Sequence, residues 1–61
     1  MEEKTRHTVS NTYRMILEVF GRAEAQDFQA RIEQLGVNPS IEAVHTVIRQ
    51  KIMELARLDE S

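Results

Sequence analysis

Carboxylate side chains are the groups in this sequence that could perform acid–base chemistry. Glu24 with Asp27, and Glu54 with Asp59, stand close together in segments rich in helix-forming residues, where such spacings are ordinary for solvated charges. Catalysis requires groups that converge in a pocket with little water, and a single small helical domain has little room for one. We therefore predict no enzymatic activity and no catalytic residue.

Hydroxyl and metal-binding side chains lead to the same conclusion. Ser10 and Ser40 stand where helix-capping roles are expected, and neither has a neighbouring base that could activate it. The sequence has no cysteine, and its two histidines, His7 and His45, are far apart and belong to no cluster with ligand spacing. We therefore predict no metal site and no cofactor.

Size and charge restrict the remaining classes of protein. A chain of 61 residues forms one domain at most, and such a domain buries only about 60% of the surface of its unfolded chain. Without a disulfide or a metal, self-association is the remaining way to stabilise it. The net charge of −2, with the two signs interspersed, makes a nucleic-acid partner an unfavoured interpretation.

The sequence shows no pattern typical of a targeting signal or a membrane span. The N-terminus begins with two acids and has no apolar leader segment, and the longest apolar run is only the stretch "MIL" that starts at Met15. A membrane span needs about 20 apolar residues. We expect a cytoplasmic protein that does not enter a membrane.

The C-terminal third of the chain has the clearest helical pattern. Apolar residues step by three or four positions through Ile41, Val44, Ile48, Ile52 and Leu55. Asn38 is a suitable N-cap and Pro39 suits the first helical position. We predict a helix over residues 39–58, with residues 59–61 frayed.

The preceding segment is also predicted to be helical. Phe28, Ile32 and Leu35 share one stripe, and Asp27 with Arg31 makes a supporting pair four residues apart. Gly36 is expected to end this helix in a left-handed conformation. The short connection that follows suits an antiparallel helical hairpin.

Residues 10–21 allow three interpretations. Val9, Tyr13, Ile16 and Phe20 step as one face of a helix. In a strand, one face would instead carry Tyr13, Met15, Leu17 and Val19 and the other face Arg14, Ile16, Glu18 and Phe20. Because a lone glycine costs only about 1 kcal/mol within a helix, we favour a continuous helix over residues 10–35. The alternatives are a break between two helices at Gly21 and a strand over residues 12–20.

The predicted fold is all-α: an antiparallel helical hairpin at residues 10–58, preceded by a flexible tail at residues 1–9. A two-helix hairpin cannot cover all of its apolar side chains, and large exposed apolar patches mark partner surfaces. We therefore predict a homodimer in which two hairpins form a four-helix bundle. The predicted dimer or partner interface comprises Tyr13, Ile16, Leu17, Phe20, Phe28, Ile41, Val44, His45, Ile48, Ile52 and Leu55.

The expected function is that of a small protein-interaction module, an adaptor, inhibitor or regulator of a larger protein. The alternative is a DNA-binding regulator. The corner at Gly36 resembles the turn of a helix-turn-helix motif, although positions 42 and 45 carry Glu42 and His45 where apolar residues are usual. The layout also resembles a ribbon-helix-helix protein if residues 12–20 form a strand, but neither face of that strand offers a row of base-reading donors.

Overall fold

A computed structural model describes the backbone of residues 1–60 and the side chains of residues 1–58. Three helices follow one another: α1 spans Glu3–Phe20, α2 spans Arg22–Glu33 and α3 spans Ile41–Glu60. Within the described residues the fold is therefore all-helical and contains no strand, so the strand interpretation of residues 12–20 is wrong. The expected fraying at the C-terminus reaches Ser61, which lies outside the described residues, whereas α3 continues through Glu60.

The first helix begins at Glu3, seven residues before the start expected at Ser10. Residues 3–9, assigned to a flexible tail from the sequence, form the first two turns of α1. Thr5 and Val9 are buried, and they extend toward the N-terminus the same face that carries Ile16. This end of the helix is ordered because its buried side chains join the packing of the other helices, which matters more for a short helix than propensity does.

Gly21 ends α1 and begins α2, so the prediction of one continuous helix over residues 10–35 is wrong. Its backbone has φ 101° and ψ 175°, a region that is open almost only to glycine. The Gly21 amide donates to the carbonyl oxygens of Ile16 and Leu17, at 3.1 and 3.2 Å, and the Gly21 carbonyl accepts from the Ala25 amide at 3.2 Å. A single residue thus satisfies backbone groups of both helices while the chain changes direction.

The connection between α2 and α3 contains the predicted glycine conformation. Gly36 has φ 102°, which confirms the expected positive φ, but α2 ends at Glu33 with Gln34 as its C-cap, so Gly36 does not itself end the helix. The N-cap of α3 is Ser40 rather than Asn38, because the Ser40 hydroxyl accepts a hydrogen bond from the Ala43 amide at 3.2 Å. Pro39 is buried and precedes the helix instead of occupying its first position.

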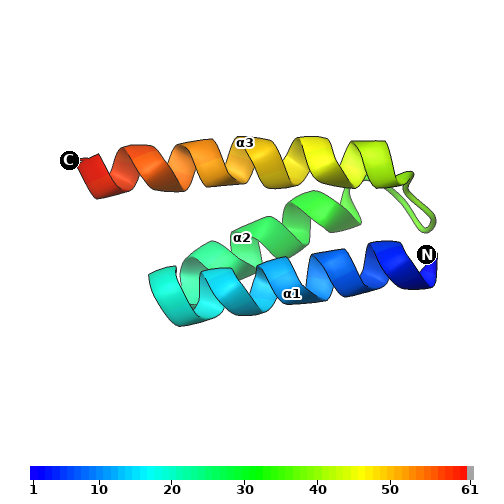
Figure 1. Ribbon diagram of the computed structural model, residues 1–61, viewed down its shortest axis with the longest axis horizontal. Helices are drawn as coiled ribbons and strands as arrows, with labels where there is room; N and C mark the ends of the chain where they lie inside the picture. The colour runs from blue at the N-terminus through cyan, green and yellow to red at the C-terminus, as the bar shows by residue number, and fades with distance from the viewer. Residues whose placement is uncertain (61) are drawn as a thin grey trace.

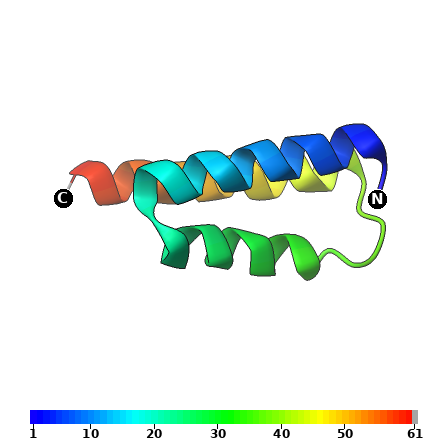
Figure 2. The same cartoon turned by 90° about the horizontal axis from the view of Figure 1, so that it is seen from below.

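The three helices pack side by side around one core. α1 and α3 run in the same direction, and α2, which connects them in the sequence, runs in the opposite direction (Figure 1). α2 contacts both of the other helices. In the view from below, α1 lies in front of α3, and α2 lies to one side of both (Figure 2). The break at Gly21 therefore converts the expected pair of helices into three packed helices. The buried apolar core consists of Val9, Ile16, Ala25, Phe28, Ile32, Val44, Val47 and Leu55.

Candidate functional site

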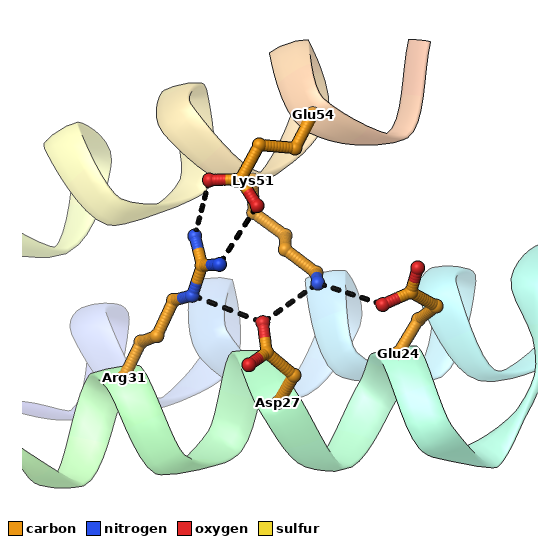
Figure 3. A network of polar contacts seen from close by, with 5 residues as sticks. All are labelled: Glu24, Asp27, Arg31, Lys51 and Glu54. Carbon is orange, nitrogen blue, oxygen red and sulfur yellow. Dashed lines mark hydrogen bonds and ion pairs between the residues drawn. The ribbon is translucent and has the colours of Figure 1, made fainter. Parts of the chain in front are cut away.

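A network of charged side chains joins α2 to α3 (Figure 3). Lys51 comes from the middle of α3, and its ammonium donates to Glu24 Oε1 at 3.0 Å and to Asp27 Oδ2 at 2.7 Å. The Lys51 side chain is only 3% exposed, whereas those of Glu24 and Asp27 are 29% and 45% exposed. The network therefore buries a cation beneath two carboxylates that remain in contact with water.

Arg31 extends the network along the outer side of α2. Its guanidinium donates two hydrogen bonds of 2.7 Å to the two carboxylate oxygens of Glu54, and its Nε lies 2.9 Å from Asp27 Oδ2. The two-pronged contact with Glu54 uses the planar geometry in which arginine and carboxylate pair best. The predicted pairing of Asp27 with Arg31 is confirmed, and Asp27 is revealed as an acceptor shared by two cations.

The network shifts the pKa values of Asp27, Glu54 and Lys51 so that each group stays charged. The hydrogen bond from Lys51 holds the pKa of Asp27 below its ordinary value, and the one from Arg31 does the same to the pKa of Glu54. Burial by itself would lower the pKa of Lys51, but its hydrogen bonds to Asp27 and Glu24 outweigh burial and raise that pKa. All of these shifts favour the charged forms, so the network is a set of permanent ion pairs near neutral pH.

Expectations from the sequence need correction here. The sequence predicts Glu24, Asp27 and Glu54 to be solvated charges, and the side chains of Asp27 and Glu54 are indeed 45% and 50% exposed, but all three also form ion pairs with basic residues. Lys51 is also buried, although charged residues are rarely so. The signal that could have revealed it is its position, since Lys51 follows Val44 by seven residues and precedes Leu55 by four, on the same face of α3.

The residues predicted to form an interface divide into three groups. Ile16, Phe28, Val44 and Leu55 are at most 1% exposed, so they form the core within one chain and cannot contact a partner. Tyr13, Phe20 and Ile48 are partly buried against that core. Leu17, Ile41 and Ile52 are 38–39% exposed, and His45 is also exposed. The sequence pattern cannot separate these groups, because apolar residues on the core-facing side of a helix and on its neighbouring flank both recur every three or four positions.

Exposed apolar side chains remain on one flank of α3. At about 100° per residue, Glu54 lies about 80° to one side of the core residue Val44, and Ile52 lies about 80° to the other side. Glu54 is bound to α2 through Arg31, so Ile52 belongs to the flank that faces away from α2. We call this the free flank, and it comprises Ile41, His45, Ile48 and Ile52.

Other surfaces of the described chain offer less chemistry. Arg6, His7 and Ser10 line a shallow depression on α1 with a volume of about 150 Å³, which is open to solvent. Among the described side chains, no group of three histidines and acids is arranged to hold a metal ion. Within the same part of the chain, no helix has the length and apolarity needed to cross a membrane.

The geometry thus contains an ion-pair network with a buried lysine between two helices, and a free flank on which Ile41 and Ile52 are exposed. The network is suited to holding α2 and α3 together, since its lysine is buried and its acids are already paired with basic side chains. The free flank has the features of a contact surface. Comparison with models of protein families, with curated proteins and with solved structures finds no match in any of the three.

Proposed function

We propose that this protein is a small homodimeric interaction module that acts as an adaptor, inhibitor or regulator of a larger protein and performs no catalysis itself. The observation that supports the proposal best is the set of large apolar side chains left exposed on α3. Ile41 and Ile52 are 38% and 39% exposed, although a chain this short has few apolar residues to spare.

The total exposed area supports the same proposal. The chain exposes 4565 Å². The scaling of surface with mass predicts about 4,100 Å² for a monomeric protein of this mass. The excess accompanies an elongated form with extents of 35 × 18 × 16 Å. A second copy laid along this length would cover apolar surface that a single chain leaves in water.

The use of basic side chains within the chain argues against a nucleic-acid partner. Lys51 and Arg31 are both held in ion pairs with acids of the same chain, so neither is free to neutralise a phosphate. The remaining basic residues belong to a chain whose net charge is −2, which disfavours binding to the negatively charged phosphates of DNA. A protein partner therefore agrees better with the charge distribution than DNA does.

Sedimentation equilibrium at micromolar concentration tests the dimer directly. The expected mass is twice the chain mass of 7.1 kDa. Ile52→Ser should weaken association at least about tenfold, because each interface loses a buried apolar side chain. Met53→Ser is the matched control, since Met53 is the next residue, is exposed and points about 180° from the core residue Val44. A monomeric wild-type chain with a cooperative unfolding transition would contradict the proposal.

Titration with nonspecific duplex DNA at low salt separates the interaction module from the regulator alternative. We expect no binding in the concentration range in which the dimer forms. Binding whose affinity falls steeply as salt is added would favour a DNA-binding regulator instead, because that dependence reports release of counterions from phosphates.

A further inference from the structure

The free flank of α3 carries a pattern that can match a copy of itself. Ile41, His45, Ile48 and Ile52 step by four, three and four residues, which is the spacing of the contact positions in a pair of packed helices. The three isoleucines make this flank mainly apolar, and His45 is its one polar member. The flank lies on the side of α3 opposite to Glu54, whose carboxylate is bound to Arg31 of α2.

Two charged residues of opposite sign border this flank. Glu42 follows Ile41 and Arg49 follows Ile48, so both lie along the outer edge of the free flank and are separated by two turns. Both side chains are exposed, and no ion pair or side-chain hydrogen bond within the chain is seen for either among the described contacts. They are therefore free to pair with charges on another molecule.

We propose that a second copy of this chain docks on the free flank with its α3 antiparallel to the first. This inference rests on the proposed homodimer and specifies which surface and which register it uses. Ile41 of one copy packs against Ile52 of the other, and His45 packs against Ile48. The two-fold axis passes near Thr46 and Val47, and each of these contacts therefore occurs twice.

Charge complementarity supports this register. In an antiparallel pair, the outer edges of the two helices meet, and the register above brings Glu42 of each copy beside Arg49 of the other. The interface then contains two ion pairs of opposite charge and no pair of like charge along that edge. A parallel pair instead leaves Glu42 and Arg49 about 10 Å apart along the axis and places His45 beside His45.

The single polar member of the flank is compatible with this arrangement. In the antiparallel register, the flat His45 ring lies against the apolar Ile48 of the second copy, and its nitrogen edge lies toward the outer side of the seam. Histidine has an apolar body and a polar tip, so the ring can contribute contact area while its nitrogens remain hydrated. The larger apolar contact, Ile41 with Ile52, then lies at both ends of the seam.

Charge reversal at the edge tests the register. E42R alone and R49E alone each turn both ion pairs into like-charge contacts, and each should raise the dimer dissociation constant by about tenfold. The double variant E42R/R49E restores opposite charges and should return to the wild-type value. An equimolar mixture of E42R and R49E should form the heterodimer in preference to either homodimer, as measured by native mass spectrometry from the different chain masses.

A second pair of variants controls for net charge. E18R and R14E make the same changes of charge on α1, away from the free flank, and their mixture should show no preference for the heterodimer. A wild-type chain that remains monomeric would overturn both the dimer and this register. A wild-type dimer whose association is unaffected by E42R and R49E, with a random mixture of species, would overturn the register alone and would point to another surface or another protein as the occupant of the flank.

Discussion

Lys51 Nζ of α3 lies 2.7 Å from Asp27 Oδ2 of α2, and the two side chains have very different exposure. Lys51 is 3% exposed and Asp27 is 45% exposed. The ion pair is therefore asymmetric, because the carboxylate can recover water if its partner is removed and the ammonium cannot. This asymmetry determines which changes to the network should destabilise the protein.

Replacement of the cation should be tolerated better than replacement of the acids. Lys51→Met keeps a long side chain in the buried space, and Glu24 and Asp27 can be hydrated, so we expect the free energy of unfolding to change by less than about 1 kcal/mol. Glu24→Gln with Asp27→Asn leaves a buried ammonium without a charged partner and should cost about 2 kcal/mol or more.

Chemical denaturation of the Lys51→Met variant and of the double variant Glu24→Gln/Asp27→Asn measures the two changes in the free energy of unfolding. Glu18→Gln with Glu33→Gln is the control, because it removes the same amount of charge from exposed acids outside the network. A larger loss for Lys51→Met than for the double acid variant would show that the acids, and not the lysine, depend on the pairing.

Acidification should weaken the fold in a way that depends on Asp27 and Glu54. Both acids have a folded-state pKa below their ordinary values of 3.8 and 4.5, chiefly because Lys51 and Arg31 respectively donate hydrogen bonds to them. The unfolded chain therefore takes up protons first as the pH falls, and the free energy of unfolding decreases from about pH 4.5 downward. At alkaline pH the raised pKa of Lys51 predicts a second loss above its ordinary value of 10.5.

Urea unfolding at a series of pH values measures the acidic limb. Asp27→Asn should be less stable near neutral pH and should lose less stability on acidification than the wild type, because one linked proton is gone. Glu18→Gln serves as the reference, since Glu18 is exposed and contributes no contact to the network. If the free energy of unfolding falls equally with pH in Asp27→Asn and in the wild type, the role assigned to the ion pair of Asp27 with Lys51 is contradicted.

Gly21 should resist replacement by any L-residue. Its φ of 101° and ψ of 175° are strained for a side chain, although a Cβ there would meet no atom within 4 Å. Gly21→Ala should therefore cost about 1–3 kcal/mol through backbone strain alone. Thermal unfolding of a synthetic chain with D-alanine in place of Gly21 supplies the control, because a D-residue adopts positive φ readily. Equal losses for the L and D forms would contradict the explanation.

The helical class could be predicted because local patterns carry it. The period of three and four residues from Ile41 onward predicts α3, and the structure places Val44 and Leu55 of that series in the core. Gly36 could be assigned a positive φ because a glycine after a helical stripe commonly ends the helix in that way. The pair of Asp27 and Arg31 follows from their spacing within one helix. These features each depend on residues within a few positions of one another.

The break at Gly21 and the burial of Lys51 were decided by tertiary structure. A glycine inside a helix costs so little that the sequence leaves the chain free to continue or to turn, and packing of α2 against both other helices selects the turn. A lysine on an apolar face can remain buried only if carboxylates from another helix reach it. Glu24 and Asp27 do so only because α2 folds back against α3, which is a relation between distant segments that no local pattern contains.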